Sequence, residues 1–157
     1  MTASAQEGEL PEPGITPDNP LYGLDKAMES IQSAFSSGNE EKARNRLKIA
    51  EERLAEAKAM ADKGNYELSE EMSDEYESQI DRSIELGNST SDLEHKEDIQ
   101  EIVANATTRH QMVLERIIDQ VPEPAKRAID RSLNASMKGR EKSLDALGNT
   151  NPAKAAK

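Results

Sequence analysis

Residues 43–61, ARNRLKIAEERLAEAKAMA, decide the fold class of this chain. Apolar side chains recur in this stretch at spacings of three and four residues: Ala43, Leu47, Ala50, Leu54, Ala57 and Ala61. Such spacing places them on one face of an α-helix, whereas a half-buried strand alternates at every second residue. Because most of these side chains are small, the stretch predicts a helix that packs closely against its neighbours.

The same period continues through most of the chain, and a Gly or a Pro ends or follows each periodic segment. We expect helices over residues 20–37, 39–63, 65–87, 91–121 and 125–147. In the first of them the expected buried stripe comprises Leu21, Leu24, Met28, Ile31 and Phe35. Only three Val and one Phe occur, and no alternating apolar run is present, so no strand is predicted.

The pattern predicts an all-α fold, an elongated bundle of four long antiparallel helices plus a shorter N-terminal helix. The stripes are narrow, which favours small crossing angles between the helices and argues against a large ligand cavity. The bundle domain is expected to span residues 20–147. Residues 1–19 read as a flexible, acidic, Pro-rich linker, and residues 148–157 as a disordered tail.

Composition limits the partners and the chemistry of the chain. Its 157 residues carry a formal net charge of −11, with a pI near 4.7 and no Cys. Without Cys there is no disulfide, thiolate metal site or thiol nucleophile. The negative charge argues against nucleic acid as a partner, and no apolar run is long enough for membrane insertion. Leu, Ile, Val and Phe are so few that composition alone suggests disorder, and periodicity carries the case for a folded bundle.

Negative charge is concentrated on the helix expected over residues 65–87, which has eight acidic residues and a single base, Arg82. Five of the acids form one ridge at helical spacing: Glu67, Glu70, Asp74, Glu77 and Asp81. One interpretation is a face that weakly binds Ca²⁺ or another divalent cation. The other, which we favour, is a solvated face partly balanced by basic residues of the neighbouring helices. We therefore assign no metal site.

The two histidines give little support for catalysis. His110 lies on an apolar stripe, where a buried imidazole with a hydrogen-bond partner is the usual outcome. His95 and Asp98 stand three residues apart and are able to hold a surface metal weakly, although such pairs at a helix start are usually just solvated. No nucleophile or phosphate-binding motif is present. We expect no catalytic residues, no enzymatic activity and no cofactor.

Two features suit an exported protein. Asn88, Asn105 and Asn134 each begin an Asn-x-Ser/Thr glycosylation sequence, and Asn88 is expected to be the most accessible of the three. Ala3-Ser4-Ala5 fits either the small-residue end of a signal-peptide cleavage site or a chance occurrence of this pattern in a loop. The sequence therefore favours an extracytoplasmic, secreted or cell-surface location.

The first helix opens with Pro20, Leu21, Tyr22 and Leu24. Proline fixes the first turn, and Leu21 and Leu24 are expected to begin the buried stripe. The ring of Tyr22 is expected to pack at the end of the bundle while its hydroxyl reaches a polar partner. We interpret this motif as structural.

Four stretches carry a resemblance to a known family: ITPDNPLYGLD (15–25), RLKIAEERLAEA (46–57), RHQMVLER (109–116), and Val121-Pro122 followed by residues 125–147. Together they resemble an exported all-helical domain family of unknown function, found in archaea and bacteria, with a P-x-x-P-L-Y-x-L motif behind a signal peptide. The resemblance covers about residues 14–148. It implies export and a helical bundle, and it brings no activity, cofactor or catalytic residue.

The resulting hypothesis is a non-enzymatic, extracytoplasmic helical-bundle module, archaeal in origin, with a structural or protein-interaction role at the cell envelope. Its partner is an unknown protein or envelope component. The alternative is a cation- or ligand-binding sensor or carrier that uses the acidic ridge. A hydrolase or transferase would need carboxylates from the third and fourth long helices around one cleft. Apolar residues left over from the stripes complete the core or form a homo-oligomer face: Ile49, Met60, Leu86, Leu93 and Met112.

Overall fold

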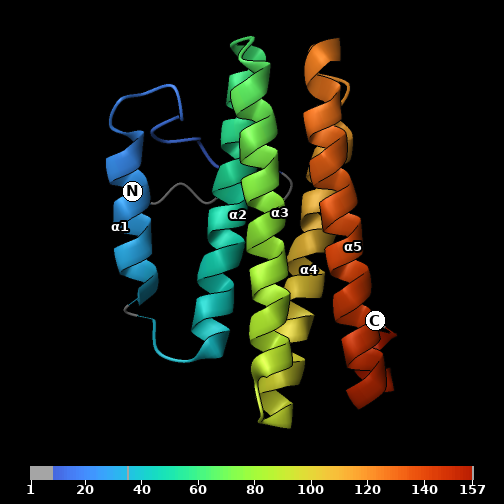
Figure 1. The fold of residues 1–157 in the computed structure, drawn as a ribbon. Helices are drawn as coiled ribbons and strands as arrows, with labels where there is room; N and C mark the ends of the chain where they lie inside the picture. Colours follow the sequence, from blue (N-terminus) through green and yellow to red (C-terminus); the bar gives the residue numbers. More distant parts are fainter. Residues whose placement is uncertain (1–8, 35, 157) are drawn as a thin grey trace.

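The computed structural model describes residues 9–34 and 36–156, and within residues 30–34 it describes the backbone alone. This part of the chain contains helices and no strand (Figure 1), as expected. The elements are α1 (Tyr22–Ala34), α2 (Asn39–Asp62), α3 (Tyr66–Ser89), α4 (Leu93–Ile117), the 3₁₀ turn η1 (Glu123–Ala125), α5 (Lys126–Thr150) and α6 (Pro152–Ala155). Ala3-Ser4-Ala5, Phe35 and the side chain of Ile31 lie outside the described part.

Helices α2 to α5 form the bundle, each running antiparallel to the one before it (Figure 1). The closest packing joins α2 to α3 and α4 to α5, and α3 also packs along α5, so α2 and α5 hardly meet. The buried stripes meet in one apolar core, whose largest members include Leu54, Tyr76, Ile80, Ile99, Leu114 and Ile129. The all-helical bundle predicted from the sequence is confirmed.

The stripe of α2 is buried along its whole length, from Ala43 to Ala61. Its small side chains let α3 approach closely, as predicted. A second close approach lies between α5 and α3 at Gly139, where an added Cβ would stand 2.5 Å from Cγ2 of Ile80. Glycine is therefore needed at that position for contact between the two helices.

Gly87 was expected to end the third helix, but α3 continues through it to Ser89. Gly87 is buried, and a Cβ there would stand 2.5 Å from Nε2 of Gln100 on α4. The glycine makes room for a neighbouring side chain instead of terminating the helix. At the other boundary, α4 ends at Ile117, four residues before the expected end, and Val121 is still buried in the turn that follows.

The C-terminal segment differs from the disordered tail that we expected. α5 runs to Thr150, and the short helix α6 follows it. Asn151 caps α6 and also donates from Nδ2 to Glu97 at 3.1 Å, while Nζ of Lys154 lies 3.2 Å from Asp98. A proline at the first helical position and acidic side chains on α4 thus order residues that composition alone suggested would fray.

The described part of the linker is not free of the bundle. Leu10 is partly buried against the core, and Lys63 of α2 forms an ion pair of 2.8 Å with Asp18. Pro11 and Pro13 line the same surface groove as Ala55. Residues 9–19 therefore form an irregular segment that is fastened to the bundle.

Helix α1 lies beside α2, outside the four-helix bundle (Figure 1). The prediction that Leu21 and Leu24 begin a buried stripe is wrong: Leu21, Leu24 and Met28 are 57%, 64% and 64% exposed. The helix turns its polar side toward the bundle instead, because that side carries Tyr22 and Glu29, which contact a buried arginine of α2. We call the exposed set Leu21, Leu24 and Met28 the α1 stripe.

Candidate functional site

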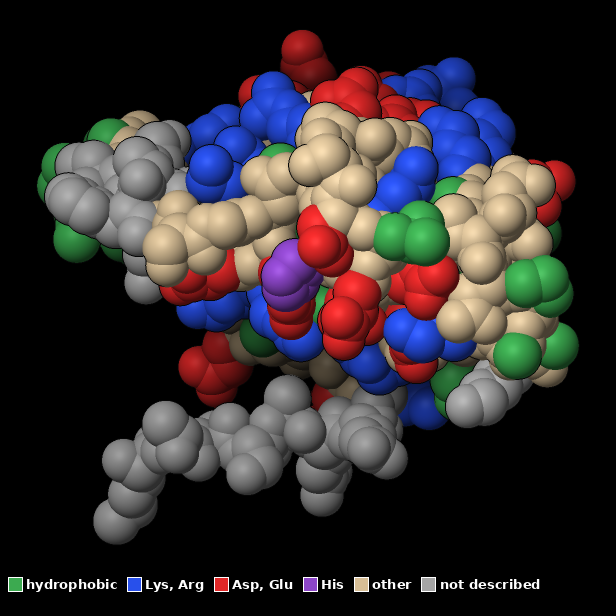
Figure 2. Space-filling view, turned by 90° about the horizontal axis from the view of Figure 1, so that it is seen from below, with side chains coloured by type: hydrophobic (Ala, Val, Ile, Leu, Met, Phe, Trp, Pro, Cys, Tyr) green, Lys and Arg blue, Asp and Glu red, His purple; other side chains and the backbone are tan. Residues whose placement is uncertain are grey.

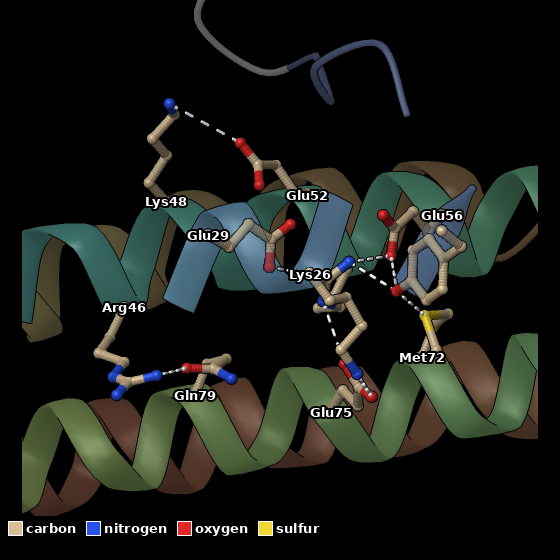
Figure 3. A network of polar contacts seen from close by, with 11 residues as sticks. Lys26, Glu29, Arg46, Lys48, Glu52, Glu56, Met72, Glu75 and Gln79 are labelled. Atoms are coloured by element: carbon tan, nitrogen blue, oxygen red, sulfur yellow. Dashed lines mark hydrogen bonds and ion pairs between the residues drawn. The ribbon is translucent and has the colours of Figure 1, made fainter. Parts of the chain in front are cut away.

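The most deeply buried charge of the described chain is Arg53, in the middle of α2. Its guanidinium contacts carboxylates from three helices: Glu29 of α1, Glu56 of α2 and Glu75 of α3. Nε of Arg53 lies 3.1 Å from Oε2 of Glu75. Figure 3 shows the three carboxylates converging on the space between the helices. One side chain therefore joins α1, α2 and α3.

The hydroxyl of Tyr22 completes this arrangement. It accepts a hydrogen bond from Nη1 of Arg53 at 2.8 Å and lies 2.9 Å from Oε2 of Glu56 and 3.2 Å from Sδ of Met72. Lys26, one turn further along α1, binds Glu75. The expectation that the Tyr22 hydroxyl reaches a polar partner is confirmed. We call this set the Arg53 clasp: Tyr22, Lys26, Glu29, Arg53, Glu56, Met72 and Glu75.

Burial acts on the buried groups of the clasp in different ways: it raises the pKa of the Glu56 carboxyl, which opposes its charge, whereas Arg53 keeps its charge. Removal from water opposes the charge of Arg53, but hydrogen bonds and attraction from Glu56 and Glu29 outweigh it and raise the pKa of Arg53 above its ordinary value. Burial also raises the pKa of the Tyr22 hydroxyl, which therefore stays protonated and can donate to Glu56. Its contacts join α1, α2 and α3, so the clasp fastens these three helices to one another.

A second polar network crosses the core through His110 of α4, which is 3% exposed. Nδ1 lies 3.1 Å from the hydroxyl of Tyr76 on α3, and Nε2 lies 3.2 Å from Oε1 of Glu51 on α2. The predicted buried imidazole with a hydrogen-bond partner is confirmed. The hydrogen bond from His110 lowers the pKa of Glu51. Both ring nitrogens are engaged, so this network links helices and offers no free nitrogen to a ligand.

The acidic ridge faces basic side chains of α5. Glu70 lies 2.8 Å from Arg127, Asp81 lies 2.8 Å from Lys142, and Asp74 forms an ion pair with Arg131. Glu67 and Glu77 form no ion pair within the described residues. The balance by basic residues of a neighbouring helix that the sequence suggested is thus present, and three of the five ridge carboxylates already have cationic partners.

His95 and Asp98 lie at the lower end of the bundle, where Glu40 of α2 joins them. One ligand atom from each of the three lies within 4.8 Å of the others, and Figure 2 shows the exposed histidine among acidic side chains. The sequence suggested the pair within one helix, but Glu40 comes from 55 residues away and had no local indication. Glu40 also binds Arg44, and Asp98 also binds Lys154.

The three glycosylation candidates have exposed side chains and lie on helices. Asn88 stands in the last turn of α3, inside the helix and not beyond its end as expected. Its Oδ1 accepts a hydrogen bond from Gln100 at 3.1 Å. Asn105 lies within α4 and Asn134 within α5.

A half-open cleft of about 870 Å³ lies between α1, α2 and α3, below the clasp. This differs from the sequence-based expectation that no large cavity is present. Its lining includes three basic residues that had no special place in the sequence analysis: Lys42, Arg46 and Arg82. We call it the basic cleft.

Comparison with known families accounts for most of the chain. The model of a domain of unknown function, DUF5667, matches residues 14–124. The chain belongs to the DUF5667 family. The DUF5667 match includes α1 to α4 and ends just before α5, the helix that closes the bundle and pairs with the acidic ridge. No curated protein and no solved structure gives a match.

The predicted membership of a family of unknown function is therefore confirmed, whereas export and an archaeal origin stay predictions. In the part of the chain that is described, no helix combines the length and the apolar character needed to cross a membrane.

Proposed function

We propose that this DUF5667 protein is a non-enzymatic helical-bundle module that binds a partner protein at the cell envelope through α1. The observation that carries the proposal is the α1 stripe. Leu21, directly before α1, and Leu24 and Met28 within it are all more than half exposed and follow one another at helical spacing. Large apolar side chains grouped on the surface of a folded protein typically mark a contact with another molecule.

The way α1 is held supports a role in contact. The opposite face of the helix is fastened by the Arg53 clasp through Tyr22, Lys26 and Glu29. The stripe therefore points away from the bundle because polar contacts hold the helix in that orientation. A helix fixed in this way presents its apolar side chains without first having to fold, which lowers the entropic cost of binding.

Charges around the α1 stripe indicate the chemistry of the partner. Met28 borders a groove that is also lined by Glu12, Asp25 and Glu52. Burial, the larger cause, and repulsion from Glu29 raise the pKa of Glu52. We infer a partner surface that is apolar at its centre and bordered by Lys or Arg side chains. A second copy of this acidic chain would fit less well, since its own border carries the same charge.

The absence of an enzymatic role is part of the proposal. Both buried polar networks engage their functional groups with each other, and each acts between helices. The alternative of a cation sensor built on the acidic ridge has less support, because Glu70, Asp74 and Asp81 already bind basic side chains of α5.

The envelope location rests on the sequence features, namely Ala3-Ser4-Ala5 and the three Asn-x-Ser/Thr sequences, whose Asn side chains are exposed. Fractionation of the native host tests it. We expect the protein in the envelope or extracellular fraction, and recovery from the cytosol alone would contradict the proposal.

Partner binding is tested by placing a photo-activated cross-linking residue at Leu24 or, as a control, at Met137, which is 54% exposed on α5. In living cells we expect one discrete adduct from position 24 and none from position 137. With the purified partner, Met28→Lys should weaken binding by at least about tenfold, the effect of 1.4 kcal/mol, and Met137→Lys should not. An adduct of two copies of this chain, or equal effects of the two lysines, would rule out the proposed contact.

A further inference from the structure

The antiparallel register of α2 and α3 places a second pair of charged side chains opposite each other below the clasp. Arg53 of α2 lies against Glu75 of α3. One heptad earlier on α2 stands Arg46, and one heptad later on α3 stands Arg82. Because the helices run antiparallel, the register that pairs Arg53 with Glu75 sets Arg46 against Arg82. Both residues line the basic cleft. Two like charges therefore face each other where the level above has an ion pair.

A hydrogen bond holds the side chain of Arg46 in position opposite Arg82. Its Nη1 donates to Oε1 of Gln79 at 3.2 Å, and Figure 3 shows the two side chains pointing toward each other across α2 and α3. Burial, together with repulsion from Arg82, lowers the pKa of Arg46. The hydrogen bond to Gln79 leaves the remaining guanidinium donors available to another molecule.

Three cationic side chains of the cleft lack acidic partners within the described residues. Arg46, Arg82 and Lys42, which stands one turn before Arg46, form no ion pair with a described carboxylate. Several cations elsewhere on the bundle do form ion pairs, namely Arg44, Lys58, Lys126, Arg131 and Lys142. In a chain with a net charge of −11, three uncompensated cations around one hollow are a local reversal of sign.

The remaining walls suit a small polar molecule. Glu29 and Glu75 also border the cleft, but both are engaged by Arg53, which leaves Glu85 as the other carboxylate of the lining. Ser78 and Ser89 provide hydroxyl groups. Ile49 and Leu86 provide apolar surface. A volume of about 870 Å³ is of the size that binds metabolite-sized ligands in other proteins.

We propose that the basic cleft binds a small molecule that carries an oxyanion group, with this group held between Arg46 and Arg82 and assisted by Lys42. Guanidinium groups match the geometry of phosphate, sulfate and carboxylate oxygens through paired N–H donors. An anion between the two arginines removes their repulsion, so the site gains from neutralisation as well as from hydrogen bonds. A long polyanion such as nucleic acid is disfavoured, because the rest of the surface repels it.

Isothermal titration calorimetry of the complete chain tests the proposal. The probes are pyrophosphate, citrate and sulfate, each compared with NaCl at matched ionic strength, and they distinguish phosphate, carboxylate and sulfate chemistry. We expect saturable binding of at least one probe at a single site, with a dissociation constant below about 1 mM. Saturation with that probe at about 100 times the dissociation constant should raise the melting temperature by roughly 5–10 °C.

Variants separate this site from general attraction between charges. Arg46→Gln and Arg82→Gln should each weaken binding by about tenfold or more, since each removes hydrogen bonds to a charged group. Arg109→Gln and Lys138→Gln are matched controls. They remove the same charge from exposed residues of α4 and α5 and should bind as the parent chain does. Arg82 is exposed, so its replacement tests the site independently of the partly buried Arg46.

Two results would overturn the proposal. One is the absence of saturable binding for all three probes up to about 10 mM, a range that would reveal even weak sites. The other is binding that Arg82→Gln leaves unchanged or that the two control variants weaken equally. The experiment is independent of the α1 stripe, so its failure leaves the proposed partner contact untouched, and the reverse also holds.

Discussion

Arg53 and Arg46 lie one heptad apart on α2, at an upper and a lower level of its contact with α3, and their surroundings are opposite in charge. At the upper level Arg53 is surrounded by Glu29, Glu56 and Glu75. At the lower level Arg46 has Gln79 as its partner and faces Arg82. Both levels lie on the same pair of helices, and the difference lies in the side chains that α1, α2 and α3 place around each arginine.

This difference suggests separate roles for the two arginines, one in stabilising the fold and the other in binding a ligand. A buried ion pair that is complete in itself fastens the fold and has nothing left to offer a ligand. An arginine that is positioned but not neutralised costs the folded state some stability and keeps its donors available. Natural proteins commonly retain such costs where they bind something. We therefore regard the upper level as architecture and the lower level as a binding site.

The largest expected difference in stability is between variants that replace the arginine of the upper level and variants that replace the arginine of the lower level. Arg53→Met leaves buried Glu56 without its partner and should lower the free energy of unfolding by about 3–5 kcal/mol. Arg46→Met removes a repulsion and should change it by less than about 0.5 kcal/mol. Urea denaturation of both variants measures the difference. Equal losses would show that the two levels are not distinct.

A smaller, local effect is expected at the junction of the clasp with α1. Tyr22→Phe removes the hydroxyl that binds Arg53 and Glu56, at a cost of about 1–2 kcal/mol. Hydrogen exchange should become faster in residues 22–29 and stay unchanged in α2 to α5. Tyr66→Phe is the control, because no hydrogen bond of its hydroxyl is found among the described residues. Global acceleration of exchange would mean that the clasp supports the whole bundle and not α1 alone.

A gain in stability is expected when the lower level is converted into a copy of the upper one. Arg82→Glu places a carboxylate opposite Arg46, as Glu75 is placed opposite Arg53, and should add about 0.5 kcal/mol as a partly exposed ion pair. Thermal unfolding at low salt measures the gain, which should shrink in high salt. The same variant should lose anion binding. A destabilised Arg82→Glu protein would contradict the proposed register of charges.

The smallest effect concerns pH and the polar network of His110, in which His110 and Arg109 lower the pKa of Glu51. A carboxyl whose pKa is lower in the folded than in the unfolded state contributes stability above its unfolded value near 4.5, and this contribution is lost as the pH falls further. Melting temperatures between about pH 6 and pH 3 should therefore fall less steeply for Glu51→Gln than for the parent chain. Glu115→Gln, on the exposed face of α4, should keep the parent slope. Identical slopes for all three proteins would exclude a special role for Glu51.

The sequence predicted what periodicity within one helix can determine. The buried face of α2, the buried His110 and the end of α2 near Gly64 follow from spacing and from residues that stop helices. The same reasoning failed for Leu21 and Leu24, because an apolar stripe shows that one face differs from the other but not which face meets the bundle. The partner that decided it, Arg53, lies on another helix.

Contacts between helices account for the other surprises. Gly87 was interpreted as a helix end, yet its function is to leave room for Gln100, a residue 13 positions away. His95 and Asp98 could be paired from their spacing, whereas Glu40 could not. Arg46 and Arg82 could have been found by writing the sequences of α2 and α3 antiparallel in the register that pairs Arg53 with Glu75. Without a structure, nothing in the chain selects that register.

Helix α1 has two surfaces in use at once, since Lys26 and Glu29 form one wall of the basic cleft while Leu21 and Leu24 face outward. Any partner that shifts α1 on binding must therefore change the shape of the cleft, and any anion that draws the walls together must change the position of α1. Thermodynamic reciprocity requires the two affinities to change by the same factor. Helix α1 would thereby couple the binding of a small molecule in the cleft to the binding of a partner protein.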